Sequence, residues 1–333
     1  MKMRKLGKNG PEISALGYGA MSFSDFYGPT TDQQSYAILR ACLDAGVTHL
    51  DSANVYGMGR SEKVIGQFLK DNPGTRDRFH IATKASITRD EDGNRCFRNT
   101  LEHLESELDK SLGKLGTDCV DLFYVHRRQA ELPIEEVAGH LGRLVEKGKT
   151  KGIGFSEIAP TSLRRAATEC HVDAVQSEYS LSVRSPEMGL VQTCAELGTA
   201  LVAFSPVGRS FLTDTPLSFE TVQDIGGWVG ANPRFQADTY PANIAATDPF
   251  RAYAAEQGVS AAALAIAWVL AQGPHVIAIP GTRSTAHFAQ LVEGWNLTLT
   301  PEQLARIEEI LPIGWAYGDR YSTGQWVGPE RYC

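Results

Sequence analysis

The chain has 333 residues, of which 42% are hydrophobic and 21% are charged, and its formal net charge is −7. This is the composition of a globular protein, long enough for either two small domains or one large α/β barrel. A mildly acidic chain argues against a nucleic-acid scaffold, which normally presents a basic surface.

The cysteines and the apolar segments indicate where such a protein would work. The six cysteines are scattered and form no C-x-x-C pair, which indicates reduced thiols. The N-terminal stretch lacks the apolar segment of a secretory signal, and the longest apolar run, VSAAALAIAWVLA, is too short to cross a membrane. We therefore expect a cytoplasmic protein with no nucleic-acid or membrane partner. The sequence does not determine the oligomeric state.

The N-terminal segment predicts a β-hairpin. Two short runs within residues 4–14 flank Asn9-Gly10, a pair that favours a type I′ turn. A hairpin at this position can plug one end of a barrel. The apolar run ISALGYGAM follows, and we interpret it as the first core strand, ending near Met21.

Strand and helix patterns then alternate along the chain. Short runs rich in Val, Ile, Leu, Ala and Phe predict eight strands, beginning near residues 15, 47, 78, 118, 151, 172, 199 and 275. Helical periodicity predicts a helix at 61–69 with Ser61 as a possible N-cap. It also predicts helices at 32–45, 97–113, 133–148, 160–170, 185–197, 259–273, from about 284, and at 301–311.

This alternation predicts a fold class. Strands connected by helices form parallel sheets, and strands that are apolar on both sides are buried on both faces. Eight such units that close on themselves give the (β/α)8 TIM barrel, here a single domain over residues 1–333 with an N-terminal β-hairpin and long loops. An open doubly wound sheet is disfavoured because no G-x-G-x-x-G follows the first strand.

Two segments interrupt the alternation. Residues 208–246 are rich in Gly, Pro and Thr and hold two aromatic clusters, and the tail at 313–333 is also aromatic-rich. Long loops in compact domains are usually functional, so we expect both segments to lie over the C-terminal face of the barrel. The alternative is that they simply cover exposed core.

Four polar residues lie at or just beyond three consecutive predicted strand ends. Asp51 and Tyr56 belong to HLDSANVYG, Lys84 closes FHIATK, and His126 closes CVDLFYVH. An ammonium lowers the pKa of a nearby phenol, and a carboxylate holds that ammonium charged and in place. A neutral imidazole can orient a carbonyl oxygen. The set predicts protonation of a carbonyl that receives a hydride.

At these residues the sequence resembles the aldo-keto reductase superfamily, over nearly the whole chain. The resemblance is carried, in order, by LGYGAMSF, HLDSANVYG, SEKVIG, IATK, DLFYVHR, KGIGFS, VQSEYS, FSPVGRSFL and IPGTRS. It is nearest to the general bacterial, plant and fungal members. It implies a TIM barrel that binds a nicotinamide cofactor without a Rossmann domain and reduces aldehydes or ketones. Asp51, Tyr56, Lys84 and His126 match the family's catalytic tetrad.

Later strand ends hold candidate cofactor contacts. Ser156 and Gln176 end two strands, where their polar groups can bind a carboxamide. Phe204 stands where the family has an aromatic residue that stacks on the nicotinamide ring. The segment after it is a candidate pyrophosphate cradle, made by Ser205, Pro206, Gly208 and Arg209.

The last strand leads to a candidate anion site. Gly281, Thr282 and Arg283 precede a helix N-terminus, and Arg283 suits an adenosine 2′-phosphate, which favours NADPH. Gln290 is a candidate cofactor contact in the following helix. The family usually has Asn at the position of Glu157 and Glu-Asn at that of Gln290-Leu291, so the carboxamide and adenine contacts depart from its pattern.

The substrate side is less readable in the sequence. We expect a small-molecule carbonyl substrate in a pocket that includes Met21 and Tyr27, and no metal site. One alternative is a barrel aldolase that uses Lys84 as a Schiff-base amine, which would need a neutral lysine. Another is a cofactor-binding regulatory protein like the channel β subunits, although the hairpin here begins close to Met1.

Overall fold

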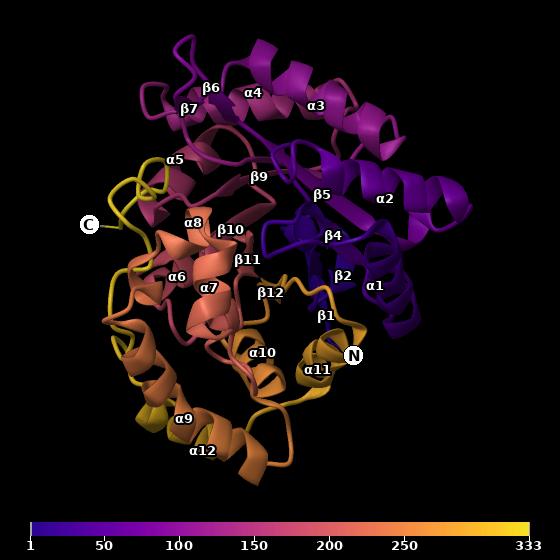
Figure 1. Ribbon diagram of the computed structural model, residues 1–333. Coiled ribbons are helices and arrows are strands. Elements are labelled where there is room, and N and C mark those ends of the chain that lie inside the picture. Colours follow the sequence, from indigo (N-terminus) through magenta and orange to yellow (C-terminus); the bar gives the residue numbers. More distant parts are fainter. Residues whose placement is uncertain (1, 333) are drawn as a thin grey trace.

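The structure is a computed structural model that describes residues 2–332, and its centre is a barrel of eight parallel strands. The strand order is β3-β4-β5-β8-β9-β10-β11-β12. Leu16 makes a parallel bridge with Ala278, which joins the first strand to the last. Figure 1 shows the helices arranged around these strands. The predicted (β/α)8 barrel is confirmed.

The elements have the following bounds. The strands are β1 Met3–Lys5, β2 Glu12–Ser14, β3 Tyr18–Gly19, β4 His49–Asp51, β5 His80–Ala85, β6 Ile87–Arg89, β7 Arg95–Phe97, β8 Leu122–Val125, β9 Ile153–Ser156, β10 Ala174–Glu178, β11 Ala200–Phe204 and β12 Val276–Ala278. The α-helices are α1 Asp32–Ala45, α2 Arg60–Asp71, α3 Leu101–Leu115, α4 Ile134–Glu146, α5 Pro160–Glu169, α6 Leu190–Leu197, α7 Phe219–Ile225, α8 Gly227–Gly230, α9 Tyr240–Glu256, α10 Ala261–Ala271, α11 Thr285–Asn296 and α12 Pro301–Ile310.

The alternation of side chains along each strand decides what enters the barrel. In β5, Ile81 packs outward under the helices, whereas Ala82 joins the inner core. Because side chains alternate between faces, Lys84 also points inward. Lys84 is in register with Tyr124 of β8, and the same alternation carries His126 to the inside just beyond that strand. Strand parity therefore delivers polar side chains to one end of the barrel.

The N-terminal hairpin closes the opposite end. Its strands β1 and β2 are antiparallel, and Leu6 and Ile13 join the inner core beside Ala82 and Ala174. The predicted turn type is wrong. The connection spans residues 6–11 between Lys5 and its partner Glu12, and the left-handed position belongs to Gly7 (φ 76°), not to Gly10. The hairpin acts as the plug that the sequence led us to expect.

Several element boundaries differ from the prediction. The first barrel strand ends at Gly19, because a 3-10 helix takes over at Ala20–Ser24. Ser61 lies inside α2, behind Gly59 at the N-cap, and its hydroxyl donates to the Ala20 carbonyl instead.

The helix α3 begins four residues later than predicted, at Leu101 rather than residue 97. Residues 95–97 are instead strand β7, which pairs with β6 in an antiparallel hairpin outside the barrel.

The segment 208–246 is more regular than predicted. It contains α7 and α8, and α9 begins at Tyr240 and continues to Glu256. These helices surround their own apolar cluster, in which Phe211 stacks on Phe235 with 4.9 Å between ring centroids. The segment is therefore a packed subdomain next to the barrel mouth rather than an open loop.

Two features concern the chain as a whole. Among residues 2–332 no single helix is long and apolar enough to span a membrane, and the pair α9 and α10 reaches that length only with a 92° bend between them. The cysteines within this range are free thiols, and Cys333 lies outside the described residues.

Candidate active site

The four tetrad residues meet at the C-terminal end of the barrel. The ammonium of Lys84 donates to Asp51, to the Ser52 carbonyl (2.6 Å) and to the Tyr56 hydroxyl (3.4 Å). The imidazole of His126 lies edge-on to the Tyr56 ring, with 5.8 Å between centroids. The sequence predicted these four residues as one site, and the structure brings them together.

The loop after β4 sets the position of Tyr56. It turns tightly, with left-handed conformations at Gly57, Met58 and Gly59. A Cβ on Gly57 would lie 3.0 Å from the Cβ atoms of Ser24 and Arg60, so a larger residue would push the loop away. The close approach holds the phenol over Lys84.

Burial and charge compete over the pKa of Tyr56. Burial raises the pKa of Tyr56 and the ammonium of Lys84 lowers it, with burial the larger effect, so the net pKa is above its ordinary value. The lowering effect that the sequence predicted for Lys84 is present, but burial outweighs it. The lysine only limits the rise.

The other two members have well-defined charge states. Burial disfavours the charged form of Lys84, but Asp51 and Tyr56 outweigh burial and raise the pKa of Lys84. Burial, reinforced by the positive charges of Arg127, Lys84 and Arg95, holds the pKa of His126 well below its ordinary range. At neutral pH the site therefore combines a lysine cation with a neutral imidazole.

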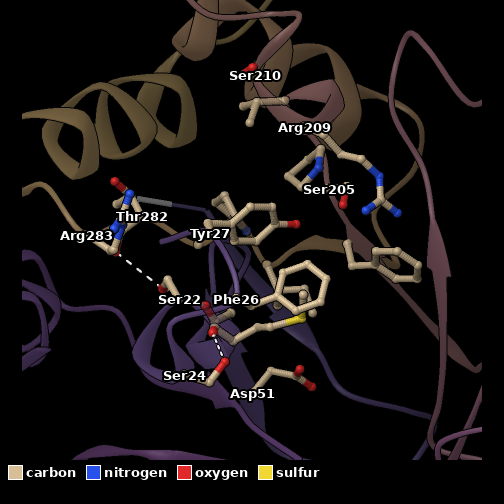
Figure 2. A pocket seen from close by; sticks show the side chains of 18 of the residues that line it. Ser22, Ser24, Phe26, Tyr27, Asp51, Ser205, Arg209, Ser210, Thr282 and Arg283 are labelled. Carbon is tan, nitrogen blue, oxygen red and sulfur yellow. Dashed lines mark hydrogen bonds between the residues drawn. The ribbon is translucent and has the colours of Figure 1, made fainter. Parts of the chain in front are cut away.

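A cavity of about 820 Å³ opens above the tetrad. Asp51, Tyr56 and His126 lie at one end, and Arg283 and Gln290 of the α11 region line it elsewhere. Figure 2 shows Arg283 and Thr282 on one side of the cavity and Ser205 and Arg209 across from them, with Tyr27 between. Of the other predicted positions, the cavity lining includes Met21, Ser156, Gln176, Phe204, Pro206 and Gly281.

The donor set of this cavity fits a dinucleotide cofactor. The Gln176 amide already donates to Asp51 (2.7 Å), which fixes it between the tetrad and the Ser156 end of the next strand. Ser284 caps α11 by accepting from the His287 amide, and the other amides of the first helical turn remain free for an anion. Ser156 and Gln176 would hold a carboxamide, and the α11 N-terminus with Arg283 would hold a phosphate.

Three predicted or flagged residues have other partners. Gly208 does not line the cavity and instead packs against Ser182 and Leu212. Arg209 borders the cavity but forms a two-bond ion pair with Glu178, at 3.0 and 3.1 Å. Glu157, which occupies the usual Asn position, is outside the cavity lining.

The carboxylate of Glu157 belongs to a buried ion cluster. It pairs with Arg320 of the tail at 2.5 Å and accepts from the Glu178 amide at 2.8 Å. Arg320 also lies 3.5 Å from the Glu178 carboxylate, which in turn holds Arg209. Glu157 thus anchors the C-terminal tail.

Residues 15–312 match the aldo/keto reductase family. The chain belongs to this family. It is 34% identical over 325 residues to aldo-keto reductase yakc of Schizosaccharomyces pombe, whose name specifies NADP(+), covering 96% of this chain and 94% of that protein. It is 36% identical over 321 residues to probable aldo-keto reductase 1 of Glycine max, covering 96% and 92%. Membership makes this aldo/keto reductase an oxidoreductase.

Solved structures show the same fold. The glycerol dehydrogenase of Gluconobacter oxydans superposes with a TM-score of 0.80 at 25% identity, covering 93% of this chain and 94% of that one. An aldo/keto reductase of Klebsiella pneumoniae, in complex with NADP and acetate, gives a TM-score of 0.73 at 23% identity, covering 97% and 99%. The second of these is informative for the fold alone.

Some lining residues of this aldo/keto reductase were not foreseen. Arg95 comes from the β7 hairpin, Trp228 from α8 and Tyr321 from the tail. Arg127 directly follows His126 and was quoted only as part of a motif. The Asp92-Gly93 pair favours a hairpin turn and could have predicted β6 and β7. No local sequence pattern predicts that this hairpin reaches the cavity.

Proposed function

We propose that this protein catalyses the NADPH-dependent reduction of aldehyde or ketone groups to alcohols. The observation that carries the proposal is the tetrad itself: a phenol within 3.4 Å of a buried ammonium, at the end of a cavity that fits a dinucleotide. The NADP(+) in the name of the Schizosaccharomyces pombe relative supports the choice of cofactor.

The positions of the four residues support a division of labour among them. Bound NADPH would supply the hydride that the carbonyl carbon accepts. Tyr56 donates its proton to the carbonyl oxygen and is reprotonated from solvent. Lys84 stabilises the resulting phenolate, and Asp51 holds Lys84 in its charged form. The neutral imidazole of His126, beside the phenol, positions the carbonyl oxygen by a hydrogen bond.

The geometry argues against the aldolase alternative. A Schiff-base lysine must lose its proton and reach its substrate. Lys84 has no exposed surface, pairs with Asp51, and has a raised pKa. These features stabilise a fixed cation, which suits a proton-transfer site.

Replacement of the proton donor tests the proposal. The Tyr56→Phe variant should lose roughly 10²- to 10⁴-fold of its aldehyde-reducing activity with NADPH, because the general acid is gone. Cofactor binding, followed by nicotinamide fluorescence, should be unchanged. Tyr27→Phe removes a hydroxyl from the same cavity and should retain most activity. Undiminished reduction by Tyr56→Phe would overturn the assignment.

A further inference from the structure

Arg95 and Arg127 form a positively charged patch at the tetrad end of the cavity. Both line the cavity together with Tyr56 and His126. Their positive charges both lower the pKa of His126, after the larger effect of burial. A cationic patch beside the proton donor lies where a substrate's own substituents would be.

Neither arginine has a carboxylate partner among residues 2–332. The Arg127 side chain donates to the His126 carbonyl (2.6 Å) and the Ser156 hydroxyl (3.1 Å), and its buried Nε has no hydrogen-bond partner among the described residues. Arg127 is only 7% exposed. Within the part of the chain that the structure describes, the Arg95 side chain has a single hydrogen bond, to the Val327 carbonyl at 3.5 Å.

This situation differs from that of Arg209, which also lines the cavity. Arg209 is neutralised by two hydrogen bonds to Glu178. The two carboxylates of the cavity lining are both engaged elsewhere: Asp51 with Lys84 and Gln176, and Asp214 with the Ala261 amide and Gln290. Of the two arginines only Arg127 is buried, and its charge acts on the carboxylate of Glu157 without an ion pair between them among the described residues. A buried guanidinium that lacks a directly bound anion is costly, so the arrangement favours an anion brought by a ligand.

The position of Arg95 is set by aromatic packing rather than by charge. Its guanidinium lies 5.0 Å from the Phe97 ring centroid and 5.7 Å from that of Trp228. The tail supports the same region, since a Cβ on Gly328 would meet the Phe97 ring at 2.6 Å and Arg127 at 3.3 Å. Three segments far apart in the sequence therefore converge to hold the two cations at the tetrad end of the cavity.

We propose that the physiological substrate is a carbonyl compound bearing a carboxylate, which Arg95 and Arg127 bind while Tyr56 protonates its carbonyl oxygen. The planar guanidinium matches a carboxylate in two-bond geometry. The apolar Met21, Trp228 and Tyr321 of the lining suit an aromatic or alkyl body between the two groups. This inference rests on the proposed reductase function and names its substrate class.

Two aldehydes of nearly equal size test the inference. para-Carboxybenzaldehyde carries the anion, and para-carbamoylbenzaldehyde replaces it with a neutral amide. With NADPH, the wild-type protein should reduce the aldehyde group of para-carboxybenzaldehyde with a kcat/KM at least about tenfold higher than that of para-carbamoylbenzaldehyde, as expected for a charge-assisted hydrogen bond in place of a neutral one. The advantage should shrink as salt rises, because Arg95 is exposed.

Variants assign the preference to the two arginines. Arg95→Gln and Arg127→Gln should each remove most of the carboxylate preference, lowering kcat/KM for para-carboxybenzaldehyde by a clearly larger factor than kcat/KM for para-carbamoylbenzaldehyde. Arg89→Gln is the matched control, since Arg89 faces Arg95 across the β6–β7 hairpin, is exposed, and does not line the cavity. Arg95→Gln keeps the test valid if the buried Arg127→Gln variant fails to fold.

Other outcomes overturn the inference in distinguishable ways. A wild-type protein that reduces both aldehydes equally well contradicts the substrate class and leaves the reductase function intact. A preference that survives both substitutions contradicts the role of the arginines. If Arg127→Gln weakens NADPH binding and slows both aldehydes equally, Arg127 serves the cofactor instead. If neither aldehyde is reduced, the reductase function itself fails.

Discussion

At the scale of single residues, Lys84 has no spare hydrogen-bonding capacity. Its three N–H donors face three acceptors, namely Asp51, the Ser52 carbonyl and the Tyr56 hydroxyl. The side chain is fully buried, so no water competes for these bonds. The ammonium therefore acts on Tyr56 as a fixed charge. Its proposed effect on proton transfer can be tested by comparing carbonyl reduction with alcohol oxidation.

Removal of that charge should affect the two directions differently. In the proposed mechanism reduction needs the protonated phenol of Tyr56, and its raised pKa keeps this phenol protonated well above neutral pH. In the same proposed mechanism alcohol oxidation needs the phenolate, so the rate of oxidation should rise with pH through the alkaline range. In Lys84→Met the pKa of Tyr56 rises further, and the alkaline rise in oxidation should move to higher pH, with a loss of roughly a hundredfold in rate.

The measurement is a pH profile of NADPH-dependent reduction and NADP-dependent oxidation for both proteins. Asp51→Asn combined with Lys84→Met serves as the control, since it removes the carboxylate left unpaired by the single change. An oxidation profile that does not move along the pH axis would show that Lys84 holds the loop in place without tuning the phenol.

At the scale of elements, the C-terminal tail is attached to the barrel mouth by polar contacts spread along its length. Trp315 donates to the Leu181 carbonyl (2.8 Å), Gln325 to the Trp228 carbonyl (2.6 Å), and the Glu330 amide to the Glu157 carbonyl (2.8 Å). In Figure 1 the tail, in yellow, ends on the side of α5 and α6. The buried Arg320 lies in the middle of this attachment.

Loss of Arg320 should weaken both the fold and the pocket. Arg320→Met leaves Glu157 without its ion-pair partner and Glu178 with Arg209 alone, and breaking a buried ion pair costs roughly 3–5 kcal/mol. Tyr321, next in the chain, should then be less firmly held in the cavity wall, so KM for aldehydes should rise more than kcat falls.

Chemical denaturation and steady-state kinetics check this expectation. Arg331→Met is the control, because Arg331 is exposed on the same tail and its guanidinium lies 4.8 Å from the Trp326 ring centroid, outside the buried ion cluster. If the two variants are equally stable and equally active, the buried ion cluster does not hold the tail.

A second element-scale feature lies at the start of β4 and β5, where His49 and His80 are neighbours. Burial and the proximity of His49 lower the pKa of His80 to about 3, and burial lowers the pKa of His49. Asp121 opposes this shift, whereas Arg76 and Lys151 add to it. The pair is therefore neutral in the folded protein at pH values where an unfolded chain would protonate it.

The sign of the pH dependence follows from this difference. The unfolded chain binds a proton near pH 6.5, whereas folded His80 resists protonation down to about 3. The stability contribution is complete above pH 6.5 and falls by up to about 1.4 kcal/mol per pH unit as the pH drops through this window. His80→Gln should flatten the acid side of a melting-temperature profile. The control His287→Gln changes an exposed residue and should leave the melting-temperature profile unchanged. A wild-type melting temperature that does not change below pH 6.5 would contradict the argument.

The elements also show why some of the fold could be predicted. Alternating apolar runs such as FHIATK fix strand parity, and parity places Lys84 inside the barrel whatever the loops do. The start of α3 was misplaced because Arg95-Cys96-Phe97 has ordinary local propensities and is a strand only through its pairing with Ile87–Arg89. Ser61 was read as a cap, but its hydroxyl is needed by the Ala20 carbonyl, a contact between distant segments.

At the scale of the whole molecule, the cavity joins parts of the chain with different degrees of predictability. Gln176 lies on barrel strand β10, His126 directly follows β8, and Tyr56 lies in the loop after β4, so their convergence follows from the eightfold repeat. Trp228 and Tyr321 reach the cavity through packing between the 208–246 subdomain and the tail, which no local pattern encodes. The chemistry was therefore more predictable than the substrate pocket.

The same cavity links cofactor choice to global stability. A ligand that binds only the folded protein stabilises it by about 2.7 kcal/mol at a hundredfold excess over its Kd. Arg283 lies at the α11 end, donates to the Pro29 carbonyl (2.7 Å) and has no ion pair among the described residues. The 2′-phosphate of NADPH would form a charge-assisted contact with the Arg283 guanidinium at this point. NADH lacks that phosphate and would not form the contact.

Arg283→Met should therefore weaken NADPH binding by roughly tenfold or more, the usual worth of a charge-assisted contact, and leave NADH binding nearly unchanged. Thermal shifts report the same difference, because the rise in melting temperature with NADPH should fall to that with NADH. Arg306→Met in α12, an exposed ion-pair partner of Glu309, is the control. If both cofactors weaken together, Arg283 acts by holding the Pro29 loop, and the preference for NADPH must come from another group.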